Sequence, residues 1–335
     1  MTKVITKFKG GSLSSTSLMS DSNNNLFVRK TVSLTEDREY GFQRWYSQLK
    51  RIQRFNILFP GLFPDLIDYG KENDIAFMDI EYISEAVNAQ EYVKNCKNKD
   101  EIDKFMSSLI DAMKKMYSLK MSSSTKSISL YINEEIDQRL NDCYKENSFL
   151  EFLKYDTIIF NGKEIKSFVN VLDEYKDMCN KYYNKSTETF THGNITLENL
   201  LYVPEQNRVI FIDPYDENII DSELAEFSQL LQSSNGKYEI YNSKRAIVKN
   251  SQILLEIEES FGINYFNNRL IKYLKENYSL NEYIMIRLFE ISQFIRMLPF
   301  KMAIDKSKMI FFYGLASYLF SELKNEVTSL EREYK

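Results

Sequence analysis

The chain has 335 residues, of which 43% are hydrophobic and 27% charged, and this balance predicts a globular protein large enough for two lobes. Its formal net charge of −5 and the lack of a basic stripe argue against DNA or RNA as the main partner. Three cysteines without a CxxC pair suit a reducing cytosol, and a single histidine argues against a zinc site.

Strands dominate the expected elements of the N-terminal part. In chain order they are strands over 4–9 and 26–33 with one more between them, a helix over 35–55, and strands over 63–69 and 75–83. The turn Asp21–Asn25 separates the second and third strands, and Gly70–Asp74 joins the last two.

After Ile83 the expected elements are mainly helical. Apolar residues at three-four spacing predict an amphipathic helix over 99–120. The exceptions are a short β-like piece at 157–160 and a strand pair around 200–212. The fold class that follows is α+β, with a small N-terminal sheet lobe over 1–83 and a larger, mainly helical lobe over 84–335.

Membrane insertion is not expected. The first residues lack the apolar core of a signal peptide, and the longest apolar stretch, around 308–320, is too short and too interrupted to span a bilayer. We therefore expect a cytoplasmic protein without a membrane span. The sequence leaves its oligomeric state open.

The segment around the single histidine carries the most specific signal. His192 precedes Asn194 and Asn199, and an apolar strand-like run then ends at Asp213. This spacing is typical of a phosphoryl-transfer site, in which one side chain orients the acceptor hydroxyl and two oxygen ligands hold magnesium. Asn194 is the candidate orienting residue, Asn199 and Asp213 are the candidate metal ligands, and His192 holds the loop in shape. The alternative is a hairpin with an Asn-containing turn.

Lys30 is the candidate phosphate-binding residue. It shares a strand face with Val28, and an inward-pointing lysine there can pair with nucleotide phosphates. Arg29 competes for this role if the strand faces the other way. The following helix is expected to supply a partner for Lys30. Glu39 is the first choice because it adjoins the apolar helix face, and the alternatives are Glu36 and Gln43. An exposed first-turn acid favoured by the helix dipole is an equally good interpretation of Glu39.

Three further groups have weaker patterns. Gly11 and Ser12 lie in a Gly-Gly-Ser-rich loop that could cover phosphates, although no Walker A motif follows. Among the acidic residues after Asp213, Glu223 is expected to brace the loop, with Asp216 and Asp221 as alternatives and Glu217 solvated. Arg296 and Lys301 could bind an anionic acceptor or serve as structural charges.

With these residues, the chain resembles the aminoglycoside phosphotransferase and choline kinase-like superfamily, which shares the protein-kinase fold. The loop of that family reads His-Gly-Asp-x-x-x-x-Asn, followed by a strand that ends in Ile-Asp. This chain reads His192-Gly-Asn-Ile-Thr-Leu-Glu-Asn199 and then Phe211-Ile-Asp213. The match also includes Val28-x-Lys30, the hinge-like stretch 78–83, and Glu223-Leu-Ala225 in place of Asp-Leu-Ala.

The resemblance implies an ATP- and Mg²⁺-dependent kinase that phosphorylates a hydroxyl of a small-molecule acceptor. The backbone of Glu81, Tyr82 and Ile83 would hold adenine, Lys30 the phosphates, and Asn199 and Asp213 the magnesium, with the acceptor on the helical lobe. The amino-acid sequence of 211–214 and 230–239 is similar to that of a bacterial branch of the family linked to sugar and surface-polysaccharide metabolism.

One residue departs from the family pattern. Asn194 stands where the family has aspartate, and an amide orients a hydroxyl but does not take its proton near neutral pH. The alternative is therefore a nucleotide-binding pseudokinase with a regulatory or scaffolding role. A purely structural helical adaptor is a third interpretation.

Overall fold

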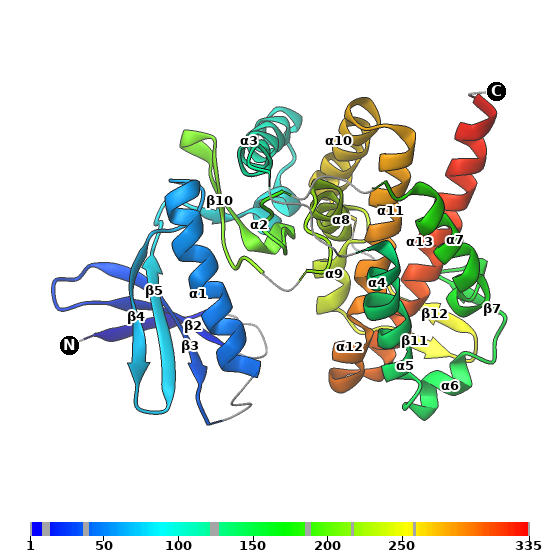
Figure 1. Cartoon of the computed structure of the whole chain (residues 1–335), viewed down its shortest axis with the longest axis horizontal. Helices are drawn as coiled ribbons and strands as arrows, with labels where there is room; N and C mark the ends of the chain where they lie inside the picture. Colours follow the sequence, from blue (N-terminus) through cyan, green and yellow to red (C-terminus); the bar gives the residue numbers. More distant parts are fainter. Residues whose placement is uncertain are drawn as a thin grey trace. The chain divides into compact units, whose positions relative to one another are not determined.

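The computed structural model describes residues 2–8, 14–35, 40–120, 127–184, 189–215, 218–256 and 259–333. The chain forms two compact units, whose elements are drawn in Figure 1. Unit 1 comprises Met1–Tyr92, Ser107–Met116 and His192–Asn218, and unit 2 comprises Val93–Met106, Tyr117–Thr191 and Ile219–Lys335. An N-terminal antiparallel sheet and a mainly helical C-terminal part confirm the predicted α+β class.

The main sheet of unit 1 has five antiparallel strands in the order β1-β2-β3-β5-β4. Their bounds are Lys3–Lys7 for β1, Ser15–Ser20 for β2, Leu26–Ser33 for β3, Leu66–Glu72 for β4 and Ile75–Glu81 for β5. The turn predicted before β3 is confirmed, because the Asp21 carboxylate accepts hydrogen bonds from the backbone N–H groups of Asn23 (2.7 Å) and Asn25 (2.8 Å). Strand β4 begins three residues later than predicted, since Pro64 has no N–H to donate and is buried with Phe63.

Helix α1 (Tyr40–Leu58) covers one face of this sheet (Figure 1). Trp45, Leu49 and Ile52 follow the three-four spacing of a helix face. They pack against Val32 of β3 and against Ala76 and Met78 of β5. The predicted helix began at residue 35; the described helix begins at Tyr40, and residues 36–39 lie outside the described part of the chain.

A second, three-stranded sheet of unit 1 carries the segment around the histidine motif. Strands β6 (Val87–Asn88), β9 (Leu200–Val203) and β10 (Arg208–Phe211) are antiparallel in the order β10-β9-β6. The strand pair predicted around 200–212 is therefore confirmed. A 3-10 turn, Leu197–Asn199, leads into β9, and another, Pro204–Gln206, follows it.

Helices make up most of unit 2. Two of them, α2 (Ala89–Asn95) and α3 (Lys99–Tyr117), contribute residues to both units. The others are α4 (Ile128–Ile132), a π-helical turn (Asn133–Asp137), α5 (Gln138–Cys143), α6 (Asn147–Phe152), a 3-10 turn (Phe168–Val171), α7 (Leu172–Tyr182), α8 (Glu223–Ser234), α9 (Tyr238–Ser243), α10 (Phe261–Asn277), α11 (Leu280–Arg296), α12 (Leu298–Ile304) and α13 (Lys306–Glu333). Helix α11 is the centre of this unit, because every residue from Tyr283 to Ile295 is buried and the helix packs against α8 and α13.

A small sheet within unit 2 was only partly predicted. Strands β7 (Thr157–Phe160), β8 (Lys163–Lys166), β11 (Ile247–Lys249) and β12 (Gln252–Leu254) pair in the order β11-β12-β7-β8. The sequence indicated β7 alone. In the described part of the chain, no helix combines the length and the apolar character that crossing a membrane requires.

Candidate active site

Lys30 lies on the face of the five-stranded sheet that α1 covers, and its side chain is buried. Arg29 points to the opposite face, because successive strand residues alternate. There its Nε and Nη2 atoms each donate to the Asp79 carboxylate at 2.7 Å, and the guanidinium lies over the Phe77 ring. The hydrogen bond to Asp79 raises the pKa of Arg29. Arg29 and Lys30 were the two candidates for phosphate binding. Arg29 is engaged in a structural ion pair with Asp79.

Lys30 has two partners, and they come from different parts of unit 1. Its ammonium forms an ion pair with the Asp213 carboxylate, and it donates to Oε1 of Gln48 at 3.3 Å. Gln48 is on α1, whose residues 40–58 contain no aspartate or glutamate. The residue that sequence reasoning missed is therefore Gln48. It interrupts the apolar stripe Trp45, Leu49, Ile52, and this polar break in an inward face is the signal that identifies it.

His192 joins the motif loop to the segment after β10 that contains Asp213. Its Nε2 atom bonds to the carbonyl oxygen of Ile212 (2.8 Å), and its Nδ1 atom accepts the backbone N–H of Asn194 (3.2 Å). These two bonds require the neutral tautomer with the proton on Nε2. The ring is buried beside Phe63 and Phe211, and burial lowers the pKa of His192 to about 4. Its position is that of a residue that shapes the loop.

Gly193 allows the loop to approach the segment after Asp213 closely. Its φ angle is +84°, and an added Cβ would lie 2.0 Å from the carbonyl oxygen of Tyr215. The backbone N–H of Tyr215 donates to the carbonyl of His192 (2.9 Å), and Asn218 Nδ2 donates to that of Gly193 (3.0 Å). Residues 192–194 are therefore held against Ile212, Tyr215 and Asn218 by backbone and side-chain hydrogen bonds.

Asn194 and Asn199 are brought together by this loop. Asn199 Nδ2 donates to the backbone carbonyl of Asn194 (2.9 Å), which also accepts the N–H of Thr196 (3.0 Å). The Oδ1 atom of Asn199 has no partner among the described residues, so it remains free to act as a ligand. The side-chain amide of Asn194 is half-buried and likewise forms no hydrogen bond within the described part of the chain.

Asp213 follows β10 in an uncommon backbone conformation. Its φ angle is +59°, in the left-handed region. The preceding residue is fixed by a hydrogen bond from the N–H of Ile212 to the carbonyl of Asn199 (3.0 Å). The carboxylate that pairs with Lys30 and the amide oxygen of Asn199 thus belong to directly bonded segments of unit 1.

The hinge-like stretch at the end of β5 is partly engaged. The N–H of Glu81 donates to the carbonyl of Asp65 (2.8 Å), and the carbonyl of Ile83 accepts the N–H of Ala86 (3.2 Å). Tyr82 is half-buried, and Ile83 packs against Val203 and Ile210. In the described residues, the N–H of Ile83 has no hydrogen-bond partner. Gly11, Ser12, Glu39 and Asp216, which were also expected at the site or as alternatives, lie outside the described residues, as do Glu36 and Glu217.

Two expectations about charged side chains of unit 2 can be compared with their contacts. The bracing expected of Glu223 is made by Asp221, whose carboxylate accepts the hydroxyl of Thr191 at 2.7 Å, whereas Glu223 accepts that of Tyr278. That expectation was wrong, because Glu223 begins α8 and its carboxylate accepts the hydroxyl of Tyr278, which follows α10. Arg296 donates to Glu135 (3.0 Å), and Lys301 donates to Asn242 (2.9 Å), as structural charges do.

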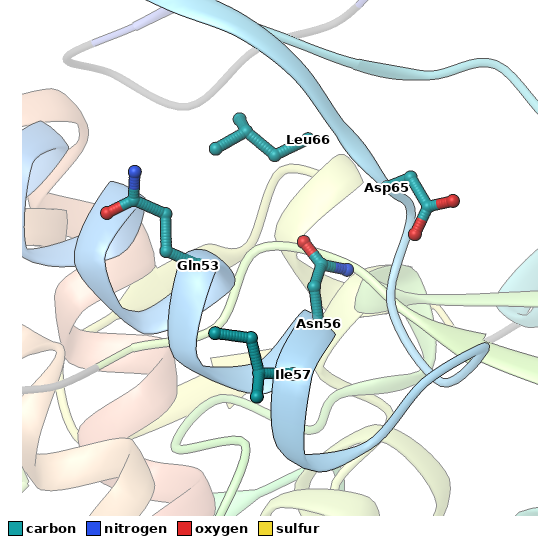
Figure 2. A pocket seen from close by; sticks show the side chains of 5 residues that line it. All are labelled: Gln53, Asn56, Ile57, Asp65 and Leu66. Atoms are coloured by element: carbon teal, nitrogen blue, oxygen red, sulfur yellow. The ribbon is translucent and has the colours of Figure 1, made fainter.

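An open groove lies at the C-terminal end of α1 (Figure 2). It is lined by Gln53, Asn56 and Ile57 of the helix and by Asp65 and Leu66 near the start of β4. None of the expected site residues within the described part of the chain lines it. Gln53 is five residues from Gln48, and at about 100° per residue its side chain leaves the helix about 140° away from that of Gln48.

The candidate metal ligands of unit 1 are too few to hold Mg²⁺ by themselves. The described residues contain no group of three His, Cys, Asp or Glu side chains that could hold a metal ion. Asp213 and the free Oδ1 of Asn199 offer two oxygen ligands of the kind that Mg²⁺ prefers. Because Mg²⁺ is usually bound by one or two protein ligands together with waters and substrate phosphates, this set fits a metal that is held jointly with a nucleotide.

Comparisons with known proteins place the fold. No protein-family model matches the chain, and no curated protein matches it in sequence. Its structure is similar to that of a protein described as "Putative fructosamine-3-kinase" from Haemophilus somnus 129PT, with a TM-score of 0.54 and 10% identity over 95% of this chain and 90% of that one. An aminoglycoside-3'-phosphotransferase of type VIII aligns with a TM-score of 0.48 and 10% identity over 86% of this chain and 93% of that one. The first likeness shows the fold: the chain has the two-lobe α+β fold of the protein-kinase class.

Proposed function

We propose that the protein is an ATP- and Mg²⁺-dependent kinase that transfers a phosphoryl group to a hydroxyl of a small molecule, such as a sugar or a related metabolite. The observation that carries the proposal is the ion pair between Lys30 and Asp213, beside an Asn199 whose Oδ1 is free. A cation for phosphates and two oxygen ligands for a metal are the parts that phosphoryl transfer requires from the protein.

Each residue then has a defined task. Lys30 would contact the nucleotide phosphates, while Asp213 and Asn199 would share the magnesium that neutralises them. The free N–H of Ile83 would donate to the adenine, beside the backbone of Glu81 and Tyr82. His192 stays neutral and holds the loop, so its contribution is to geometry rather than to proton transfer. When bound, Mg²⁺ stabilises the charge that develops on the transferred group.

Asn194 would orient the acceptor hydroxyl through its amide oxygen. During transfer, the bond between the terminal phosphorus and its bridging oxygen breaks, a bond to the acceptor oxygen forms, and the hydroxyl proton must leave. An amide does not accept that proton near neutral pH, so in this chain the proton would pass to water or to the transferred phosphate. Because the transition state is loose, loss of the base slows such a reaction without abolishing it.

A second candidate function rests on the same residue. With Asn194 in place of an aspartate, the site keeps its nucleotide-binding parts and lacks the usual base, as expected of a pseudokinase with a regulatory or scaffolding role. General-base catalysis contributes about 10²–10⁴-fold to a rate, so the two functions differ by that factor in turnover.

Calorimetric titration with ATP, with and without Mg²⁺, tests the nucleotide site that both functions share. We expect micromolar binding that requires the metal. Phosphate transfer to a panel of sugars, compared between the wild type and Asn194→Asp, then separates them. A kinase transfers measurably as the wild type, whereas a pseudokinase shows no measurable transfer as the wild type and gains it, at most, with Asn194→Asp. Absence of nucleotide binding would contradict both and would favour the structural adaptor.

A further inference from the structure

Gln48 connects two parts of unit 1 that the proposed nucleotide site needs. Its Oε1 accepts from the Lys30 ammonium at 3.3 Å, and its Nε2 donates to the Pro214 carbonyl at 3.2 Å. The amide orientation is fixed by these partners, since a flipped amide would set its NH₂ against an ammonium and its oxygen against a carbonyl. One side chain thus holds both the lysine and the residue that follows Asp213.

Only an amide meets both demands. A carboxylate at position 48 would accept from Lys30 but could not donate to Pro214, and its charge would face the carbonyl oxygen. It would also give Lys30 two anionic partners, whereas Lys30 now has one. Because α1 contains no acidic residue, the charge of Lys30 is met within the described residues by Asp213 alone.

A second contact from the same helix supports the connection. The Arg44 guanidinium, four residues before Gln48, lies over the Tyr215 ring with its carbon 5.3 Å from the ring centroid. Positions separated by four lie on one face of a helix. Helix α1 therefore contacts both Pro214 and Tyr215 through two polar side chains that lie one turn apart.

We infer that Gln48 is a positioning residue of the nucleotide site, whose amide fixes Lys30 at one end and the Asp213–Pro214 segment at the other. The inference rests on the proposed function for the role of Lys30 toward phosphate. When Lys30 exchanges its bond with Asp213 for one with the phosphates, its bond to Gln48 would keep the ammonium near its present position. The bond from Gln48 to Pro214 would keep Asp213 oriented toward the metal.

The two ends of the amide can be tested separately without nucleotide. Gln48→Glu is isosteric and keeps the acceptor for Lys30 but loses the donor to Pro214, whereas Gln48→Met loses both. We expect hydrogen exchange of the Tyr215 N–H to accelerate roughly tenfold in both variants, as for the loss of one buried hydrogen bond. Acylation of Lys30, followed by mass spectrometry, should rise in Gln48→Met only. Gln53→Glu adds the same charge on another face of α1 and should change neither (Figure 2).

A double-mutant cycle tests whether Gln48 acts through Lys30. Gln48→Met should weaken Mg²⁺–ATP binding by more than about tenfold in the wild type, where both hydrogen bonds of the amide are lost, and by clearly less when Lys30→Met is already present, because only the contact with Pro214 is then lost. Equal weakening in both backgrounds would show a general structural effect and would overturn the inference. So would unchanged Tyr215 exchange in both variants. If no variant binds ATP but the exchange and acylation results hold, the proposed function fails while the two-ended contact of Gln48 stands. Should Gln48→Met not fold, the isosteric Gln48→Glu still decides the Pro214 contact.

Discussion

Lys30 on β3 and Asp213 after β10 form an ion pair although 183 residues separate them in the chain. The lysine is nearly buried, with 8% of its side chain exposed, whereas 40% of the aspartate side chain is exposed. An exposed carboxylate can exchange its partner for a metal ion, and a buried ammonium remains near whatever anion takes its place. The two partners therefore differ in access: solvent reaches the carboxylate and hardly reaches the ammonium.

Substitutions of the two neighbouring basic residues of β3 should have different effects, one on nucleotide affinity and the other on stability. We expect Lys30→Met to weaken Mg²⁺–ATP binding by tenfold or more, roughly the loss of one charge-assisted contact, with little change in the free energy of unfolding. Arg29→Met should leave affinity unchanged but lower the free energy of unfolding by about 3 kcal/mol, because Asp79 would be left buried and unpaired. Calorimetry and urea unfolding measure the two quantities.

A matched control exists for the Arg29 effect. Arg29→Met combined with Asp79→Leu removes the stranded charge and should recover much of the lost stability. Equal loss of nucleotide affinity in Arg29→Met and Lys30→Met would contradict the assignment of the two residues to opposite faces.

Metal binding should depend on nucleotide. Because Asp213 and Asn199 supply only two ligands, Mg²⁺ alone should bind weakly, with a dissociation constant of about 1 mM or more, typical of sites with few protein ligands. Mg²⁺ should strengthen ATP binding in the wild type by tenfold or more, about 1.4 kcal/mol, and by far less in the isosteric Asp213→Asn. Titrations of ATP at fixed metal concentrations measure this difference. Tight binding of Mg²⁺ without nucleotide would show a different metal site.

Local patterns made much of the fold predictable. The turn before β3 follows from Asp21 and the left-handed Asn24, and α1 follows from the spacing of Trp45, Leu49 and Ile52. The strand pair that follows the histidine motif was predictable because one short hairpin connects its two strands. Such features depend on residues that are close in sequence, so the pattern itself contains the information.

Contacts between distant segments were not predictable in the same way. Strand β12 pairs in parallel with β7, with Gln252 beside Ile159, and three- or four-residue strands carry too little periodicity to reveal such a partner. The helix partner of Lys30 also depends on where α1 crosses β3. Sequence favoured Glu39, which adjoins the apolar helix face and lies outside the described residues, and it did not indicate Gln48, from which the described contact comes.

His192 should make stability depend on pH in a defined window. Burial lowers its pKa from 6.5 to about 4, so between these values the unfolded chain binds a proton that the folded chain does not. The free energy of unfolding should therefore fall by up to about 3 kcal/mol from pH 6.5 to pH 4 through this residue, and change no further through it below that.

The single histidine makes this measurement direct. Urea unfolding of the wild type and of His192→Gln across this pH range should differ in slope by about one proton, since no other histidine titrates. The ring protons in an NMR titration should keep the chemical shifts of the neutral form down to about pH 5, one unit above the folded pKa. An ordinary titration near pH 6.5 in the folded protein would contradict the buried, doubly bonded ring.

Gly193 should be far less tolerant of substitution than another glycine of the same backbone conformation. Gly193 and Gly162 have φ angles of +84° and +85°, yet only at Gly193 would a Cβ meet other atoms, 2.0 Å from Tyr215 O and 2.7 Å from Asn218 Nδ2. Gly162→Ala should cost only the left-handed penalty of about 1–2 kcal/mol. Gly193→Ala should cost a further 1–3 kcal/mol or so, as overpacking does, and should weaken Mg²⁺–ATP binding because the segment after Asp213 must move. Equal losses of stability in the two variants, with nucleotide affinity intact in both, would mean that the loop does not need its close approach to Tyr215.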